Sequence, residues 1–310
     1  MAVGRTPVIV GPTAVGKSAV ALALAGQFPL EIISADSRQI YRQLEAGTAK
    51  PSAKERQRVP HHGLDLVGLG ERYSAGRFAR DAAQWLVEIR GRGRLPVVVG
   101  GTGLYVRALA QGLFVEPPLD AARRRHLDQW AQELAPRELV RWAGRLDPGF
   151  RGGGKQRALR AIEVALLTGR SLSAWQQLAQ GQGIVRPWYV RLTVPRPVLH
   201  QRILARARQM VEQGLVEEVA GLLADGARPG EPGLDGVGYR EVAAYLVERR
   251  GTREGLPEAI AQSTRQYAKR QETWFRHQLP GDVLVLDAVR PAEEVAGDIV
   301  RAWKEVSGER

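Results

Sequence analysis

The sequence predicts an α/β fold: a P-loop NTPase-like core with a mostly parallel sheet flanked by helices, into which an all-helical domain is inserted. Three observations support this prediction. Short apolar segments alternate with amphipathic helical patterns, as in βαβ units. A glycine-rich loop follows the first apolar segment. The alternation stops between residues 112 and 187, where helical patterns follow one another without a strand.

Six segments have the length and apolar content of buried strands: Pro7–Val10, Leu30–Ser34, Leu64–Val67, Leu95–Val99, Trp188–Val194 and Val283–Leu286. Core helices are expected at Ala19–Phe28, Ser74–Arg90, 197–213, 215–225, 238–249 and 256–278. Helices of the insertion are expected at Asp120–Leu134, Pro136–Leu146, Lys155–Leu167 and Ser171–Leu178, with Pro117-Pro118 and Gly181–Pro187 at its two ends. Residues 1–111 and 188–310 are therefore assigned to the core, and residues 112–187 to the insertion.

The composition is that of a globular protein, with 44% hydrophobic and 25% charged residues among 310. No apolar segment approaches the roughly 20 residues that a membrane span needs. The chain contains no cysteine, which excludes disulfides, thiolate chemistry and cysteine-based zinc sites. We expect a cytoplasmic monomer that does not associate with a membrane.

The net charge is +12, and the excess of basic residues lies entirely within the first 187 residues. A basic surface favours a polyanionic partner such as nucleic acid. The alternative is a bias of the source genome, because 39 of the 45 basic residues are arginine.

The glycine-rich loop is Gly11-Pro12-Thr13-Ala14-Val15-Gly16-Lys17-Ser18, and it fits the pattern G-x-x-x-x-G-K-[ST] of a phosphate-binding loop. A predicted strand precedes it and a predicted helix follows it, which is the context that the motif requires. Its backbone N–H groups and the helix N-terminus would bind phosphate, Lys17 would reach the terminal phosphates, and Ser18 would hold Mg²⁺. The motif leaves open whether the phosphates belong to a substrate, a cofactor or a leaving group.

Two further candidates follow predicted strands. Asp36 comes after Leu30–Ser34 and should face the same crevice as the phosphate loop, since ligands lie at the carboxyl ends of parallel strands; a turn or helix N-cap is the alternative. Gly100-Gly101-Thr102-Gly103 ends the strand Leu95–Val99, where an ordinary ATPase would carry an acidic residue. Close approach of a ligand, with Thr102 supplying a hydroxyl, competes here with a tight strand-to-helix turn.

Two predicted helices carry cations. Arg202, Arg206 and Arg208 lie on one of them, and one of the three could reach the phosphates. On the last long helix, Arg265, Lys269 and Arg276 share a face, opposite two aromatic side chains, Tyr267 and Trp274. That face is either a nucleic-acid contact or simply solvated.

Taken together, these segments resemble the tRNA dimethylallyltransferase (tRNA isopentenyltransferase) family. The matching motifs occur in order along nearly the whole chain: Gly11–Ser18, Asp36–Tyr41, Gly47-Thr48-Ala49-Lys50-Pro51, Pro60-His61-His62 with Leu64-Asp65, Tyr73-Ser74 with Phe78 and Asp81-Ala82, Gly100–Tyr105, Gln156–Val164, Gly236–Arg240 and Lys269–Arg276. The chain departs from the family at Gly153-Gly154-Lys155, where Asn-Asp is usual, and at Gly63, where a larger apolar residue is usual.

The resemblance implies transfer of a dimethylallyl group from dimethylallyl diphosphate to N6 of adenosine 37, beside the anticodon of tRNA. The loop would then hold the diphosphate leaving group, with Lys17, Arg206 and Mg²⁺ at Ser18 offsetting its charge. Asp36 is the implied general base and Thr102 a positioning residue. Adenosine would be flipped out of the anticodon loop to reach them.

The resemblance also implies a set of tRNA-binding residues: Asp36, Ser37, Arg38, Gln39, Thr102, Arg124, Gln156, Arg157, Ala158, Leu159, Arg160, Asp235, Gly236, Val237, Gly238, Tyr239, Arg240, Lys269, Arg270, Gln271, Glu272, Thr273, Trp274, Phe275 and Arg276. Three other functions remain open at this point: a small-molecule kinase with a phosphate loop, a non-catalytic RNA-binding GTPase-like module, and a prenyltransferase acting on free adenine nucleotide.

Overall fold

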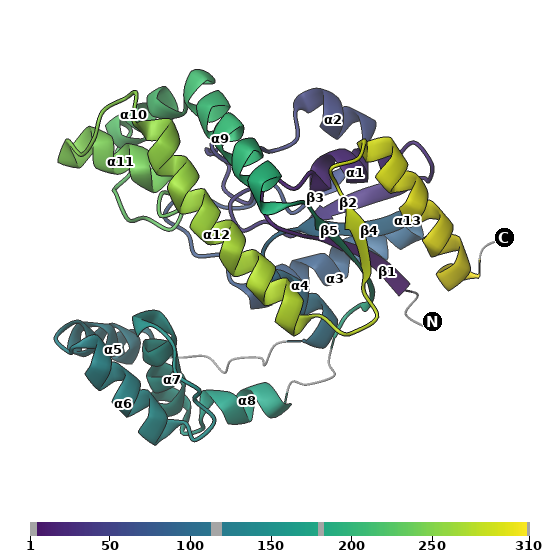
Figure 1. Cartoon of the computed structure of the whole chain (residues 1–310). Helices are drawn as coiled ribbons and strands as arrows, with labels where there is room; N and C mark the ends of the chain where they lie inside the picture. Colours follow the sequence, from purple (N-terminus) through teal and green to yellow (C-terminus); the bar gives the residue numbers. More distant parts are fainter. Residues whose placement is uncertain (1–4, 113–119, 179–182, 309–310) are drawn as a thin grey trace. The chain divides into compact units, whose positions relative to one another are not determined.

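The computed structural model describes residues 5–112, 120–178 and 183–308 (Figure 1). It divides the chain into two compact units. The first comprises the chain up to Leu109 and from Val185 onward, and the second comprises Ala110–Ile184. Among the described residues, no helix is both long enough and apolar enough to cross a membrane.

The first unit is built on a six-stranded sheet in which every neighbouring pair of strands is parallel. The strands are β1 (Arg5–Val10), β2 (Leu30–Ser34), β3 (His61–His62), β4 (Leu95–Gly100), β5 (Arg186–Thr193) and β6 (Leu284–Asp287), in the spatial order β3-β2-β4-β1-β5-β6. The central strand β1 is buried from Thr6 to Val10 and pairs with both β4 and β5. After β1 the chain continues to β2 on one side of the sheet, and after β5 it continues to β6 on the other side. Such a divergence opens a crevice between β1 and β5 at their carboxyl ends.

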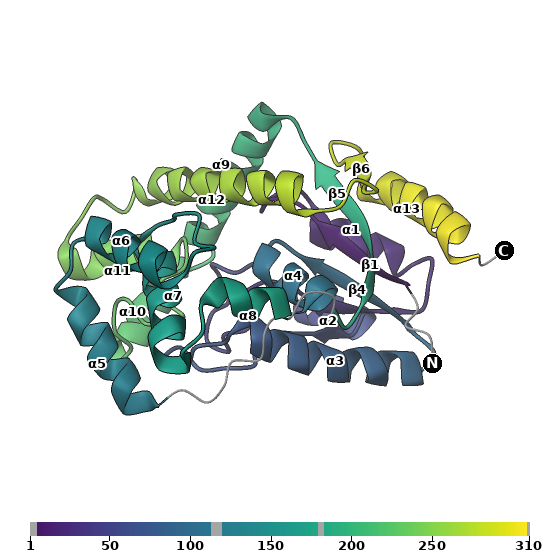
Figure 2. The ribbon, with the colours of Figure 1, turned by 90° about the horizontal axis from the view of Figure 1, so that it is seen from below.

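Helices cover both faces of this sheet (Figure 2). Helices α1 (Lys17–Leu24) and α13 (Ala292–Ser307) pack together on one face, and α3 (Ala75–Gly91) lies on the other. Helix α3 begins as its sequence indicates, because the side chain of Ser74 accepts a hydrogen bond from the N–H of Arg77. Shorter helices α2 (Ala53–Arg58) and α4 (Gly103–Gln111) follow β2 and β4.

Four helices between β5 and β6 complete the first unit: α9 (Arg196–Glu212), α10 (Leu215–Ala224), α11 (Tyr239–Glu248) and α12 (Leu256–Gln278). Helix α12 packs along α9, and α10 packs on α11 (Figure 1). The face of α12 that turns inward carries Ile260, Ala268, Gln271 and Phe275, all buried. This packing brings a C-terminal segment to the phosphate loop at the other end of the sequence.

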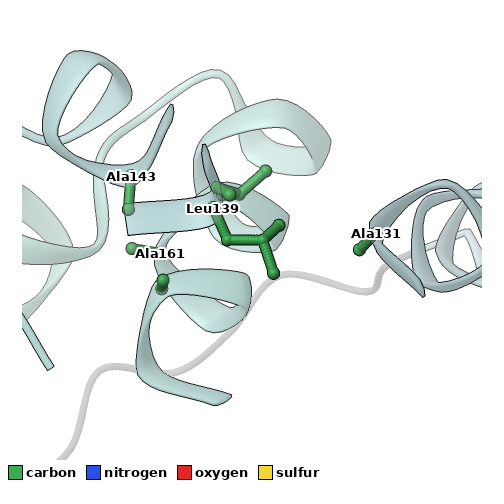
Figure 3. Close-up of a cluster of buried hydrophobic side chains, with 6 residues drawn as sticks. Ala131, Leu139, Ala143 and Ala161 are labelled. Atoms are coloured by element: carbon green, nitrogen blue, oxygen red, sulfur yellow. The ribbon is translucent and has the colours of Figure 1, made fainter. Parts of the chain in front are cut away.

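The second unit contains α5 (Ala121–Gln132), α6 (Pro136–Leu146), α7 (Lys155–Thr168) and α8 (Leu172–Leu178). Its buried core is rich in alanine. Ala131, Ala143 and Ala161 surround the larger side chain of Leu139 (Figure 3). An alanine-rich core allows helices to approach closely, as α6 and α7 do.

A buried carboxylate also stabilises this helical unit. Glu163 of α7 is 5% exposed, and it pairs with Arg124 of α5 at 2.5 Å and with Arg160 at 2.8 Å.

The predicted α/β class is confirmed, but one strand was placed wrongly. Leu64–Val67 is not a strand; the chain instead pairs with β2 at His61–His62 and forms only an isolated bridge between Val67 and Tyr41. Gly63 and Asp65 have positive φ values of 81° and 56°, so the backbone cannot stay extended there. Helices α2, α4 and α13 were not predicted. Pro117-Pro118 and residues 181–182 lie outside the described residues.

Candidate active site

The phosphate loop connects β1 to α1 through backbone conformations that require glycine. Gly11 and Gly16 have φ values of 154° and 109°, and a Cβ atom on Gly11 would lie 2.7 Å from the carbonyl oxygen of Leu192. Lys17 begins α1, and its Nζ donates to the carbonyl oxygens of Gly11 (3.0 Å) and Pro12 (2.8 Å). The ammonium group is therefore held over the loop, where an anion would bind.

Three charged side chains meet at this loop. Arg206 extends from α9, and its Nη1 lies 3.4 Å from Oγ1 of Thr13. Burial lowers the pKa of Lys17 to about 8, the nearby Asp36 carboxylate opposes that shift, and Arg206 adds to it. Burial also lowers the pKa of Arg206, and Asp36 again opposes the shift. Two desolvated cations beside one carboxylate form a site that favours an additional anion.

Of the three candidate arginines Arg202, Arg206 and Arg208 on α9, two contact the loop. Arg202 donates to the carbonyl oxygens of Val15 (3.1 Å) and Ala288 (3.0 Å), so it supports the loop from behind. Arg208 instead forms a surface ion pair with Glu258 at 3.3 Å. The structure thus places Arg206 beside the phosphate loop and gives Arg202 a supporting position that sequence reasoning did not specify.

Asp36 follows β2, and it both forms a turn and faces the cavity, which were the two alternatives that the sequence left open. Its Oδ1 accepts a hydrogen bond from the N–H of Arg38 (2.8 Å), which closes a turn, and the residue also lines the cavity next to the phosphate loop. The neighbouring turn is fixed by Thr102, whose Oγ1 accepts from the N–H of Ser37 at 3.0 Å. Thr102 therefore orders the segment that carries Asp36.

The glycines after β4 are explained by close packing. A Cβ atom would lie 2.2 Å from the Ala35 carbonyl oxygen if built on Gly100, and 2.3 Å from Gln271 Nε2 if built on Gly101. On Gly103 it would lie 2.4 Å from the ring of Trp274. Gly100 and Gly101 also line the cavity, but contact with β2 and α12 already accounts for their lack of a side chain.

Gln271 of α12 connects two parts of the site. Its Oε1 accepts from the N–H of Thr13 at 2.8 Å, and its Nε2 donates to the carbonyl oxygen of Gly101 at 2.9 Å. The side chain is only 6% exposed. Both polar atoms of its amide are therefore used in hydrogen bonds that hold the phosphate loop against the end of β4.

Tyr267 lines the cavity, whereas the sequence analysis placed it only on the helix face opposite the cations. Burial raises its pKa to about 12, the Asp36 carboxylate contributes in the same direction, and a hydrogen bond with Thr102 opposes the shift. Its hydroxyl therefore stays protonated beside Asp36 and Thr102. Ile260, Thr264, Tyr267 and Gln271 all line the cavity, and their spacing of four, three and four residues could have indicated this shared face.

These groups surround one cavity of about 790 Å³. Its walls are the phosphate loop, Asp36–Gln39, residues 45–51, residues 235–237 and the inner face of α12. Arg38 joins two of these walls, because its Nη1 lies 2.6 Å from Oδ1 of Asp235. The phosphate loop and the Asp36 carboxylate thus share one cavity.

The remaining residues that the resemblance assigned to tRNA range from exposed to buried. Lys269, Thr273, Arg276, Arg240, Gln156 and Arg157 are exposed. Ala158, Tyr239, Gln271 and Phe275 are 0%, 0%, 6% and 1% exposed. These four side chains are packed inside the protein and are not offered for direct contact, and their assignment to tRNA binding stays a prediction. Arg270 lines the cavity, with its guanidinium 5.7 Å from the ring centroid of Tyr267.

The donor set suits a magnesium ion only together with a phosphate ligand. Ser18 is exposed at the start of α1, beside the loop. Within the described part of the chain, no group of three or more His, Cys, Asp or Glu side chains could hold a metal ion. Mg²⁺ commonly takes one or two protein ligands and completes its shell with substrate phosphates and water, so a single hydroxyl fits that arrangement.

The fold and the site define a phosphate-loop transferase: an α/β core that presents a phosphate site to a carboxylate in a shared cavity, with an insertion of helices. Comparison with known proteins narrows this class. The family model described as IPP transferase matches residues 39–278. This chain belongs to that family.

Its relatives match it over most of their length. A tRNA dimethylallyltransferase of Halorhodospira halophila is 46% identical over 280 residues, which cover 88% of this chain and 90% of the relative. The crystal structure of a tRNA isopentenylpyrophosphate transferase from Bacillus halodurans has a TM-score of 0.71 at 33% identity and covers 98% of both chains. A eukaryotic dimethylallyltransferase acting on tRNA has a TM-score of 0.77 at 26% identity, covering 99% of this chain and 80% of that one.

Proposed function

We propose that this protein transfers a dimethylallyl group from dimethylallyl diphosphate to N6 of adenosine 37 in tRNA, releasing diphosphate. The observation that carries this proposal is that the phosphate loop and Asp36 face the same cavity. A diphosphate leaving group and the amine that displaces it must lie within one bond of the same carbon atom. Membership of the IPP transferase family supports the same reaction.

The reaction is a substitution at C1 of the dimethylallyl group. The N6 lone pair forms the new C–N bond while the bond between C1 and the diphosphate oxygen breaks, and that electron pair leaves with the diphosphate. Lys17, Arg206 and the loop N–H groups stabilise the charge that develops on the leaving oxygen. The proton on N6 passes to the carboxylate of Asp36, so that neutral N6-(dimethylallyl)adenosine remains.

Positioning contributes as much as charge does, because an adenine amine is a weak nucleophile. Thr102 and Tyr267 order the segment around Asp36, and Gln271 fixes the phosphate loop relative to β4. Holding both reactants in one cavity replaces an encounter in solution by a reaction between neighbours. A bound Mg²⁺, held by Ser18 and the diphosphate, would add further charge neutralisation at the leaving group.

The exposed cations of α12, Lys269 and Arg276, are proposed to contact tRNA phosphates. The helical unit supplies a second set, since Arg124 and Arg160 are held by Glu163 with their side chains 42% and 34% exposed. Single-stranded loops are where proteins read RNA bases, and phosphate contacts position them.

Transfer of label from dimethylallyl diphosphate to unmodified tRNA tests this proposal. Labelled product is expected with tRNA that carries adenosine at position 37 and is expected to be absent when guanosine replaces it. AMP and ATP serve as competing acceptors. Preferential labelling of either free nucleotide would replace the proposal by a prenyltransferase of small molecules.

A further inference from the structure

Residues 45–51 form one wall of the cavity and are built mostly from turns rather than a helix or strand. Three successive backbone N–H groups of this wall, those of Glu45, Ala46 and Gly47, donate hydrogen bonds to side chains of the helices α10 and α11. Neither of the accepting side chains, Glu218 and Tyr239, is among the cavity-lining residues. They contact the wall from behind.

The central member of this set is Glu218 of α10. Its Oε1 accepts from the N–H of Glu45 at 3.1 Å and from the hydroxyl of Tyr239 at 2.7 Å, and its Oε2 accepts from the N–H of Ala46 at 2.9 Å. The Tyr239 hydroxyl in turn accepts from the N–H of Gly47 at 3.0 Å. Three hydrogen bonds therefore join the wall to the two helices, and a fourth joins the Tyr239 hydroxyl to the Glu218 carboxylate.

The fit around this set is tight. Tyr239 is fully buried, and burial together with the Glu218 carboxylate raises its pKa, which keeps the hydroxyl protonated. A Cβ atom on Gly47 would lie 2.4 Å from the Tyr239 ring. The ring occupies the space that any larger residue at position 47 would need, so this packing of loop and helix requires glycine there.

The wall is connected to the proton acceptor. Gln39, three residues after Asp36, donates to the carbonyl oxygen of Ala49 at 3.0 Å, and its Oε1 accepts from Ser34 Oγ at 2.8 Å. The wall and the Asp36 turn are therefore fixed to each other. No described hydrogen bond joins Glu218 or Tyr239 to the phosphate loop. The wall is thus hydrogen-bonded to the segment that carries Asp36.

We propose that Glu218 is a positioning residue that holds the 45–51 wall in the shape required to orient the acceptor adenine toward Asp36. The inference rests on the proposed function for its substrate, while the contacts themselves are independent of it. Removing these bonds should affect use of tRNA and leave binding of diphosphate unchanged.

Glu218→Gln is the sharpest variant, and Glu217→Gln is its matched control. The carboxamide keeps the size of Glu218 but directs an NH₂ group toward an N–H or O–H donor, which leaves donors without acceptors. Glu217 is the next residue on the same helix and lies at the surface, paired with Arg253 at 2.5 Å. Both variants lose one negative charge, but only Glu218→Gln disturbs hydrogen bonds to the wall, whereas Glu217→Gln disturbs a surface ion pair.

We expect kcat/KM for tRNA to fall about 10- to 100-fold in Glu218→Gln, as for one or two disrupted hydrogen bonds to a charged group, with the Kd for inorganic diphosphate within about twofold of wild type. Glu217→Gln should match wild type in both. Tyr239→Phe, which removes only the hydroxyl, should show a smaller loss in the same direction. Equal kcat/KM in the two glutamine variants, or a parallel loss of diphosphate binding in Glu218→Gln, would overturn the proposal.

Amide hydrogen exchange separates this inference from the proposed function. Exchange at Glu45, Ala46 and Gly47 should accelerate in Glu218→Gln and Tyr239→Phe but not in Glu217→Gln. If wild type transferred nothing to tRNA, the proposed function would fail while this measurement still tested the contacts. Unchanged exchange in both variants would refute the contacts themselves.

Discussion

The lowered pKa of Lys17 gives a prediction that can be worked out from the site. A lysine with a pKa of about 8 is about 90% protonated at pH 7 and about 10% protonated at pH 9, whereas an ordinary lysine remains more than about 95% protonated at pH 9. The charged form binds the anion. Affinity for inorganic diphosphate should therefore fall about tenfold between pH 7 and pH 9 because of Lys17 alone.

The assay must separate Lys17 from titration of the diphosphate itself. Lys17→Arg provides the reference, since a guanidinium stays charged over this range. The ratio of wild-type to variant Kd should rise about tenfold from pH 7 to pH 9, because the titration of the ligand cancels. Parallel pH profiles for the two proteins would refute the argument that burial weakens the charge on Lys17.

A second readout does not require binding. Trace acetylation followed by mass spectrometry reports the neutral fraction of each lysine. Modification of Lys17 should approach its plateau at lower pH than is usual for a lysine. A midpoint near the usual lysine value would contradict the shift.

Three further predictions concern the chemistry and the tRNA. Asp36→Ala should lower single-turnover transfer about 10²- to 10⁴-fold, as for loss of an acid–base group, with tRNA affinity within about tenfold of wild type; wild-type turnover would exclude Asp36 as the base. Arg206→Ala should lower kcat about 10²- to 10³-fold and weaken use of dimethylallyl diphosphate; an unchanged kcat would remove Arg206 from the leaving-group site. Lys269→Gln combined with Arg276→Gln should reduce the slope of log affinity for tRNA against log salt by about 1.5, while Lys304→Gln on α13 should leave it unchanged. If the double variant keeps its slope, the outer face of α12 is only solvated. Arg270 is left intact in that test because it lines the cavity.

Elements that are determined by their own residues could be predicted from the sequence. The predicted span 256–278 coincides with α12, and Pro136–Leu146 coincides with α6, since both carry long amphipathic patterns and a proline in the first turn. The phosphate loop could be predicted because its glycines, lysine and serine occur at fixed spacing. The sequence position of Asp36, after a buried strand, likewise predicted that it would face the loop.

What could not be predicted depends on contacts between distant segments. The link between Gln271 and the phosphate loop spans 258 residues, and the link between Glu218 and the 45–51 wall spans more than 170. Nothing in the sequence around Glu218 distinguishes it from Glu217, yet one side chain accepts hydrogen bonds from the wall and the other forms a surface ion pair. The error at Leu64–Val67 has a similar origin: an apolar segment looked like a strand, but left-handed residues at positions 63 and 65 redirect the chain.

The most direct test of the central claim, that the phosphate loop holds a leaving group, is a count of products without any nucleoside triphosphate present. Wild-type protein would be given tRNA, Mg²⁺ and doubly labelled dimethylallyl diphosphate, with the prenyl group and the diphosphate measured together. We predict one diphosphate released for each prenyl group that appears on tRNA, at a rate that added ATP does not increase. A requirement for ATP, or ATP hydrolysis in step with product formation, would contradict the account and favour a kinase-like use of the loop.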